Sequence, residues 1–151
     1  NGICVSIILL MEYLMGQTNA SPWQLIELQS MGDERGCLTA LESEKNIPFA
    51  IQRVYYIYGT LPNIRRGLHA HRDLQQVAIC VAGNCTFLLD DGYHRQEIVL
   101  DSPTKALYMN SMTWREMFDF SHDCVLMVLA NHHYDESDYI RSYDDFLRMV
   151  T

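Results

Sequence analysis

The segment Arg65-Arg66-Gly67-Leu68-His69-Ala70-His71 is the most informative part of this chain. It places two imidazoles two residues apart. On a β-strand that spacing presents both rings on one face, because side chains alternate with a period of 2. The glycine frees the backbone just before the pair, and the two arginines can bind an anion. Two histidines on one face form either a metal site or an acid/base pair, and the segment itself leaves both open.

The chain around this segment predicts short β-strands separated by turns. Its apolar runs are rich in β-branched and aromatic residues, which favours strands. Asp90-Asp91-Gly92 lies between two of these runs and is typical of a β-hairpin. Strands at a spacing of roughly 8–12 residues indicate an all-β sandwich or small barrel. The predicted strands cover residues 23–28, 37–42, 53–58, 75–81, 85–89, 96–100, 106–109, 115–120 and 124–130, and residues 31–36 are predicted to form a loop.

The two ends of the chain differ from this pattern. Residues 142–150 have acidic residues near their start and apolar residues at helical spacing, which predicts a short C-terminal helix. The apolar run in residues 3–15 is interrupted by Glu12 and is too short to span a membrane. We expect residues 1–20 to be an extension outside the fold and residues 21–151 to form a single domain.

The composition narrows the function further. The chain of 151 residues has a formal net charge of -8, so we expect no nucleic-acid partner, and we expect no membrane association. Its cysteines are odd in number and have no close pair with metal-ligand spacing, so we interpret them as buried, reduced thiols of a cytoplasmic protein. We interpret residues 135–138, which are mostly acidic, as a solvated cap before the C-terminal segment. The cysteines are Cys4, Cys37, Cys80, Cys85 and Cys124.

In residues 67–83 a glycine precedes His-x-His, Gln76 follows, and Gly83 ends the segment. This arrangement resembles the metal-binding signature of cupins, which implies an all-β, double-stranded β-helix or jelly-roll barrel. However, cupins have an acidic ligand at the position of Gln76, and the position of their further histidine ligand is here Arg115, a cation that cannot bind a metal. We therefore predict no metal and interpret the two histidines as an acid/base pair.

Longer motifs follow one another in order between residues 23 and 150: Arg53-Val54-Tyr55-Tyr56-Ile57, residues 66–71, Leu74-Gln75-Gln76, residues 88–92, residues 100–103, residues 119–130 and residues 134–141. Together they resemble the sugar-nucleotide 3,4-ketoisomerases, a family of the cupin superfamily. These motifs are long and non-generic, so the resemblance is specific. One departure is Arg115, because the family pattern has a histidine after the tryptophan that is here Trp114.

The resemblance implies an enzyme that needs no metal and no cofactor. Such an enzyme isomerises dTDP-4-keto-6-deoxyglucose to a dTDP-3-keto-6-deoxyhexose by proton transfer through an enediol. The reaction lies on the route to dTDP-3-amino-3,6-dideoxyhexoses, which implies a role in lipopolysaccharide or S-layer glycans. The resemblance also implies a cytoplasmic homodimer that exchanges N-terminal strands. The C4 configuration of the product, galacto or gluco, stays open.

This reaction needs a base at C3 of the sugar and a donor to the developing oxyanion. We predict that His69 is the base and that His71 shuttles a proton or polarises the sugar oxygens, and the reverse order is also open. Tyr55 is the predicted third catalytic residue, because its phenol can donate to the enediolate. Tyr55 and Tyr56 face opposite sides of a strand, so only one of them can point into the barrel.

The substrate also carries a diphosphate, for which arginine is the suited ligand. We predict that Arg66 and Arg35 bind it, with Arg65 behind them. Gln76 and Arg115 are predicted to line the substrate pocket, where Gln76 can bind a sugar hydroxyl or orient a histidine. Two alternatives remain open: a non-catalytic cupin module that binds a sugar nucleotide, and a metal-dependent cupin enzyme.

Overall fold

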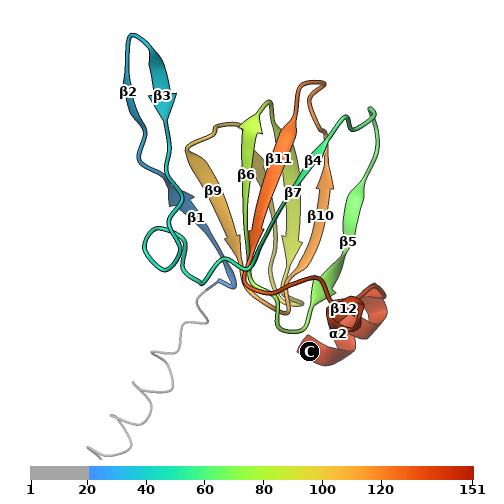
Figure 1. Ribbon diagram of the computed structural model, residues 1–151. Helices are drawn as coiled ribbons and strands as arrows, with labels where there is room; N and C mark the ends of the chain where they lie inside the picture. Colours follow the sequence, from blue (N-terminus) through green and yellow to red (C-terminus); the bar gives the residue numbers. More distant parts are fainter. Residues whose placement is uncertain (1–20) are drawn as a thin grey trace, which may run out of the picture.

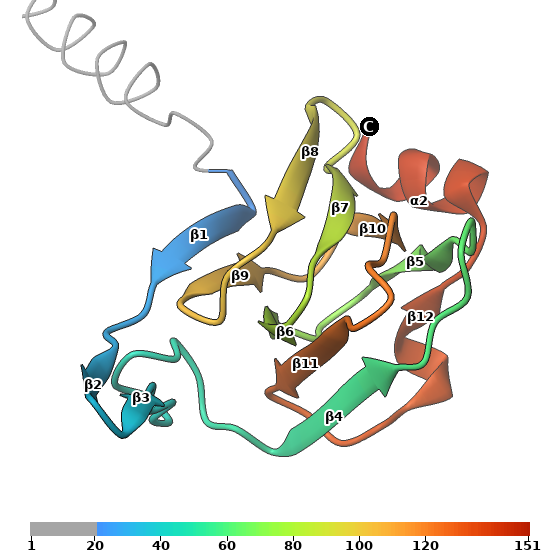
Figure 2. The same ribbon diagram turned by 90° about the horizontal axis from the view of Figure 1, so that it is seen from above.

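Two five-stranded antiparallel sheets pack against each other and form a barrel (Figures 1 and 2). The computed structural model describes residues 21–151, so the extension predicted for residues 1–20 lies outside the described residues. This architecture confirms the predicted cupin-like jelly roll with a short C-terminal helix. In spatial order, the first sheet consists of β1 (Trp23–Glu27), β9 (Lys105–Met109), β6 (Gln76–Ala82), β11 (Val125–Ala130) and β4 (Arg53–Tyr58). The second consists of β12 (Tyr139–Ile140), β5 (Arg66–His71), β10 (Trp114–Phe118), β7 (Cys85–Asp90) and β8 (Arg95–Leu100).

The segment 31–38 differs from its prediction. Its residues form a hairpin of β2 (Met31–Asp33) and β3 (Gly36–Leu38), so the loop predicted for residues 31–36 is wrong and the strand predicted for 37–42 is too long. The hairpin projects away from the barrel (Figure 1). All residues of both strands are exposed, so the sequence has no alternation of buried and exposed side chains that would reveal them.

The core lies between the two sheets, and strand β6 shows how it is built. Ala78 and Cys80 point into the barrel, whereas Val77 and Ile79 point outward, yet all four are buried. The outward pair is covered by the loop that precedes β4, which contributes the fully buried Ile47. Burial on both faces explains why this strand is a continuous apolar run in the sequence.

Helix α2 (Tyr143–Val150) packs on the outer face of the second sheet (Figure 1). Ser142 caps the N-terminus of α2 by accepting a backbone N–H from its first turn. The buried Phe146 then packs against Ala70, Trp114 and Ile140. The helix thereby fixes β5 and β12 at the end of the barrel where the two histidines lie. Within residues 21–151, no helix has the length and apolar character needed to cross a membrane.

Candidate active site

A β-bulge in β5 aims the two histidines into the barrel. The pairing of β5 with β10 shifts at this point, so that Arg115 lies opposite His69 and the next residue along β10 lies opposite Gly67. Both bulge residues have positive φ, +82° at Gly67 and +54° at Leu68. A Cβ atom on Gly67 would lie 2.7 Å from the backbone carbonyl oxygen of Arg115, so this position requires glycine.

The two imidazole rings contact each other, as their two-residue spacing predicts. The ring centroids of His69 and His71 are 4.7 Å apart and the rings meet edge to face at 84°. The ring of Tyr139, on the neighbouring strand β12, contacts both histidines at centroid distances of 4.9 Å and 4.3 Å. The histidine pair is therefore held by an aromatic side chain from the C-terminal part of the chain.

The environment of His69 leaves its Nε2 lone pair available. The Nδ1 atom of His69 lies 2.9 Å from the backbone carbonyl oxygen of Gly67. A carbonyl oxygen only accepts, so we assign the hydrogen to Nδ1, which leaves Nε2 as the basic nitrogen. Burial, and secondarily the guanidinium of Arg115, lowers the pKa of His69 to about 4. The imidazole is therefore neutral at pH 7 and can accept a proton.

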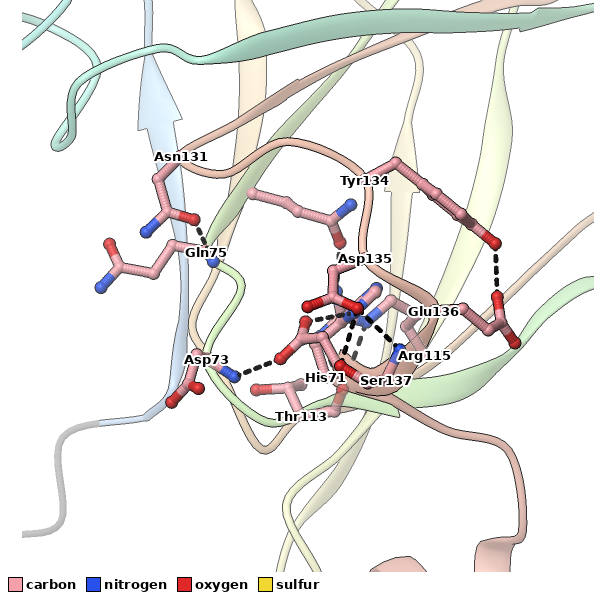
Figure 3. A network of polar contacts seen from close by, with 12 residues as sticks. His71, Asp73, Gln75, Thr113, Arg115, Asn131, Tyr134, Asp135, Glu136 and Ser137 are labelled. Carbon is pink, nitrogen blue, oxygen red and sulfur yellow. Dashed lines mark hydrogen bonds and ion pairs between the residues drawn. The ribbon is translucent and has the colours of Figure 1, made fainter.

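His71 is more deeply buried and is held by a carboxylate. Its Nδ1–H donates to Oδ2 of Asp138 over 2.9 Å, and Oδ1 of the same carboxylate accepts the backbone N–H of Asp73 over 2.8 Å. Figure 3 shows this polar network around His71 and Asp73. Burial, and secondarily the guanidinium of Arg115, keeps the pKa of His71 far below its usual value. Within residues 21–151, Nε2 of His71 has no hydrogen-bond partner.

Tyr55 completes a chain of hydrogen bonds on the inner surface of the barrel. The side chain of Tyr55 points inward and that of its neighbour Tyr56 is exposed, so Tyr55 is the tyrosine that enters the barrel. Arg115 donates to Oε1 of Gln76, and Nε2 of Gln76 donates to the Tyr55 hydroxyl over 2.9 Å. The hydroxyl oxygen thus accepts one hydrogen bond, and its own hydrogen is left to donate elsewhere. Burial raises the pKa of Tyr55, which keeps the phenol protonated at neutral pH.

Arg115 is a buried cation inside the barrel. Its side chain is 2% exposed, and its Nε and Nη2 atoms donate to the backbone carbonyl oxygen of Thr113 at 3.2 Å and 2.7 Å. Burial lowers the pKa of Arg115 to about 10, so the guanidinium remains charged at neutral pH. This charge adds to the effect of burial in lowering the pKa of both histidines.

Two cavities meet at Tyr55. The inner cavity is the smaller of the two, and the outer one is more open to solvent. His69 lines the inner cavity, whereas His71 lines a separate polar pocket with Asp73 and Asp138. The inner cavity is lined by Tyr55, His69, Gln76, Phe87, Met109, Arg115, Met117 and Val128, and the outer one by Arg53, Tyr55, Tyr134 and Tyr139.

The arginines predicted to bind phosphate lie outside these cavities. Arg35 lies in the projecting hairpin, where its exposed guanidinium pairs with Asp33. Arg65 pairs with Glu116 and lies over the ring of Phe118, 4.0 Å from its centroid. The side chain of Arg66 is exposed on β5. Within one chain, the structure therefore brings together Tyr55, His69, His71, Gln76 and Arg115, but not Arg35, Arg65 or Arg66.

Three residues of the site are missing from the sequence-based prediction. Asp138 belongs to the segment interpreted as a solvated cap; its neighbours in the 3-10 turn η1 (Glu136–Asp138) are exposed, but its carboxylate is turned toward His71. Tyr139 lies next to it. Arg53 lies two residues before Tyr55 on the same face of β4, so the period of 2 could have revealed it. No local pattern indicates that Asp138 meets a histidine 67 positions earlier.

A jelly-roll barrel that encloses two neutral histidines, a tyrosine and a buried arginine defines a cupin-like protein. The chain belongs to the family described as FdtA: WxcM-like, C-terminal, whose model matches residues 21–151. The resemblance to the sugar-nucleotide 3,4-ketoisomerases is thereby confirmed.

Three known proteins illustrate this relationship. The TDP-4-oxo-6-deoxy-alpha-D-glucose-3,4-oxoisomerase of Aneurinibacillus thermoaerophilus is 52% identical over 127 residues, which cover 84% of this chain and 91% of that protein. The structure of QdtA, a sugar 3,4-ketoisomerase from Thermoanaerobacterium thermosaccharolyticum in complex with TDP, is similar with a TM-score of 0.84 and 42% identity, covering 86% of this chain and 95% of that one. The structure of the WlaRB TDP-quinovose 3,4-ketoisomerase of Campylobacter jejuni is similar with a TM-score of 0.82 and 46% identity, covering 85% of this chain and 99% of that one.

Two further structures of QdtA carry substitutions. One has a histidine replaced by asparagine and is in complex with TDP-4-keto-6-deoxyglucose. The other has a tyrosine replaced by arginine and an arginine replaced by histidine, and is in complex with TDP. Both are as similar to this chain as the unaltered QdtA, with TM-scores of 0.85.

Proposed function

We propose that this protein is a sugar-nucleotide 3,4-ketoisomerase that converts dTDP-4-keto-6-deoxyglucose to a dTDP-3-keto-6-deoxyhexose. The observation that carries this proposal is the state of His69: a neutral imidazole in the inner cavity, with Nδ1–H bound to a carbonyl and Nε2 available as a base. The relatives named as 3,4-ketoisomerases support the same reaction.

The first step removes the proton from C3 of the sugar. Nε2 of His69 takes this proton while the C4 carbonyl oxygen becomes an enolate oxygen, to which the Tyr55 hydroxyl donates. The Arg115–Gln76 pair orients Tyr55, because the amide of Gln76 already donates to the phenol oxygen and so directs the phenol hydrogen toward the substrate. Arg115 adds a fixed positive charge beside the developing oxyanion.

The second step returns a proton to C4. Loss of the proton from the C3 hydroxyl of the enediol forms the new carbonyl, and C4 gains a proton, so hydrogen is only relocated and no electrons leave the sugar. The C4 configuration of the product depends on which face of the enediol is protonated. We propose that His71, held by Asp138 and in ring contact with His69, positions the base rather than contacting the sugar.

The substitutions in QdtA support a role in the site for three residues of this chain. The sequence intervals between the three altered positions of QdtA equal those between Arg35, His69 and Arg115 in this chain. We therefore propose that these residues occupy the equivalent positions near the sugar nucleotide. At the two positions that we align with Arg35 and Arg115, QdtA has tyrosine and arginine, and its double variant has arginine and histidine. This chain has arginine at both positions.

We also propose a homodimer that exchanges its N-terminal hairpins, so that Arg35 reaches the cavity of the partner subunit. Apolar side chains are exposed on the outer face of the edge strand β4 and on the hairpin, and burying them in a dimer would stabilise it. They are Val54, Tyr56 and Tyr58 on β4, and Met31 and Leu38 on the hairpin. Arg66 and Arg65 then flank the diphosphate in this proposal.

The cellular setting belongs to the same proposal. A nucleotide-linked substrate favours a cytoplasmic enzyme, on a route to dTDP-3-amino-3,6-dideoxyhexoses for lipopolysaccharide or S-layer glycans. Fractionation of the native host, with detection of the protein in the cytoplasmic fraction, tests the location.

The decisive experiment is NMR of the product formed from dTDP-4-keto-6-deoxyglucose in D₂O. A 3-keto product with deuterium at C4 but not at C5 supports the ketoisomerase and also reports the C4 configuration. Binding of dTDP without any exchange would indicate a non-catalytic module, and deuterium at C5 would indicate an epimerase. Loss of activity on chelation, together with stoichiometric iron or zinc, would indicate a metal-dependent enzyme.

The matching variant is His69→Asn. It removes the base but keeps a side chain of similar polarity, so conversion is expected to fall by at least about 10²-fold while dTDP binding is retained. Full activity in this variant would overturn the role of His69.

A further inference from the structure

Three buried cysteines meet at the end of the barrel that lies away from the acid/base site. Cys80 lies near the end of β6, Cys85 begins β7, and Cys124 immediately precedes β11. Gln76 and Cys80 both belong to β6 and are separated by about 13 Å along the strand. The cysteine cluster is therefore separate from the catalytic cavity.

The three sulfur atoms form a compact triangle. The Sγ atom of Cys80 lies 3.5 Å from that of Cys85 and 3.8 Å from that of Cys124, and all three lie within 4.8 Å of one another. A soft ion bound about 2.3 Å from each sulfur needs sulfur–sulfur separations of about 3.8–4.0 Å. Small movements of these side chains would thus be enough to admit an ion.

The surrounding backbone holds the triangle in place. The connection between β6 and β7 is clamped to the loop before β11 by two hydrogen bonds of 2.9 Å, from the Asn84 N–H to the Ser121 hydroxyl and from the Ser121 N–H to the Asn84 carbonyl. Gly83 packs so closely there that a Cβ atom would lie 2.8 Å from the Cα of Cys124. The three cysteines are buried, but Val81 and Asn84, which neighbour them in sequence, are exposed at this corner of the barrel.

We propose that Cys80, Cys85 and Cys124 form a binding site for a thiophilic d¹⁰ cation, with Cu(I) as the preferred ion. Within residues 21–151, no histidine or carboxylate joins the three sulfurs. Thiolates select soft ions over Mg²⁺ or Ca²⁺, and closed zinc sites require four protein ligands. A trigonal set of three sulfurs therefore suits Cu(I) better than Zn²⁺.

Binding replaces hydrogen by metal and changes no oxidation state. Each coordinating S–H bond breaks, a copper–sulfur bond forms, and the proton leaves to the solvent. Burial raises the pKa of Cys124 to about 12, whereas the contact with Cys85 lowers the pKa of Cys80. The affinity for Cu(I) is accordingly expected to increase as the pH rises.

The sequence-based interpretation of the cysteines needs correction. Cys80, Cys85 and Cys124 are buried as expected, but Cys37 is exposed, and Cys4 lies outside the described residues. The prediction missed the cluster because its ligands come from three separate segments, so no local spacing reveals them.

The test is an anaerobic titration of the reduced full chain with Cu(I) bound to bicinchoninate, a coloured competing chelator. The wild-type protein is expected to withdraw one Cu(I) per chain, and Cys124→Ser or Cys80→Ser is expected to weaken this binding at least about 10-fold. The exposed Cys37→Ser is the matched control and is expected to bind as the wild type does. Circular dichroism and retained isomerase activity show that each variant is folded.

Three outcomes would overturn the proposal. They are equal Cu(I) binding by wild type and Cys124→Ser, loss of binding in Cys37→Ser, and tighter binding of Zn²⁺ than of Cu(I). If a serine variant does not fold, Cys124→Ala replaces it, because a smaller apolar side chain leaves no unpaired hydroxyl in the core. Bound Cu(I) is also expected to raise the melting temperature of the wild type but not of Cys124→Ala.

Discussion

Asp138 holds His71 in a single tautomer. Its carboxylate accepts two N–H groups at once, the imidazole Nδ1–H of His71 and the backbone N–H of Asp73, over 2.9 Å and 2.8 Å. Nε2 of His71 is thereby left without hydrogen, next to the ring of His69. Asp138 in the 3-10 turn η1 thus determines which nitrogen of His71 carries the hydrogen, although the two residues are 67 positions apart in the sequence.

Replacing Asp138 by asparagine is expected to reduce kcat on the order of 10–100-fold with little change in KM. The amide can accept only one of the two N–H groups, and its own NH₂ then faces the other donor. Steady-state kinetics measure the effect, and Asp144→Asn, an exposed change on α2, is the control. Unchanged kcat in the Asp138 variant would contradict the positioning of His71.

The rate of isomerisation is expected to fall on the acid side only near pH 4. The proposed base is neutral His69, whose pKa is lowered to about 4 by burial and by Arg115, so it stays unprotonated down to that pH. The pH dependence of kcat/KM reports this group in the free enzyme. An acid limb at about pH 6.5, the ordinary histidine value, would argue against a buried neutral base.

The folded state is expected to become less stable as the pH falls from about 6.5 to 4. His69 has a pKa near 6.5 when unfolded and about 4 when folded, so the unfolded chain binds more protons in this interval. The contribution of His69 to the free energy of unfolding is fully present above pH 6.5, and it decreases by up to about 3 kcal/mol on acidification. Denaturant unfolding at several pH values measures it, and His69→Asn is expected to show a flatter dependence.

Gly67→Ala is expected to reduce both stability and activity. The added Cβ would meet the backbone oxygen of Arg115 at 2.7 Å in a residue with φ of +82°, at a cost of roughly 1–3 kcal/mol. Gly59→Ala is the matched control, because Gly59 also has positive φ but a Cβ there meets nothing within 4 Å. Thermal unfolding and kcat separate the two variants. Equal effects would mean that backbone strain alone explains the loss.

Arg35→Ala and His69→Asn are expected to complement each other in mixed dimers. If each site combines His69 of one subunit with Arg35 of its partner, a mixed dimer contains one intact site. Statistical mixing then restores roughly a quarter of the wild-type sites. Activity is measured after co-refolding of the two inactive variants. No recovery from verified mixed dimers would place both residues of a site in the same chain.

Most of the strands, the C-terminal helix and the interior placement of the histidine pair can be predicted from the sequence. They depend on local periodicity, and β4 alternates between half-buried and exposed residues along its whole length. The hairpin β2–β3 could not be predicted in this way, because none of its residues is buried. Its turn depends on the Asp33 side chain and on Gly36, which are local features without a periodic pattern.

The residues of the site likewise divide into those that the sequence motifs predict and those that they do not. Tyr55, His69, His71, Gln76 and Arg115 converge as the motifs predict, but Asp138 and Tyr139 reach the histidines only through the pairing of β12 with β5. That pairing joins segments separated by almost half the chain, and helix α2 stabilises it by packing Phe146 beneath it. Long-range pairing of this kind carries no signal in a single sequence.

The hydrogen bonds from Arg115 to Gln76 and from Gln76 to Tyr55 also constrain how this protein can evolve. A guanidinium only donates, so it forces the amide of Gln76 to turn its oxygen toward residue 115 and its nitrogen toward the phenol. With a histidine at position 115, an acceptor nitrogen could face the amide and reverse it, which would turn the Tyr55 hydrogen away from the sugar. Residues 76 and 115 are therefore expected to change together among descendants of this sequence, and a substitution harmless in one background would be damaging in another.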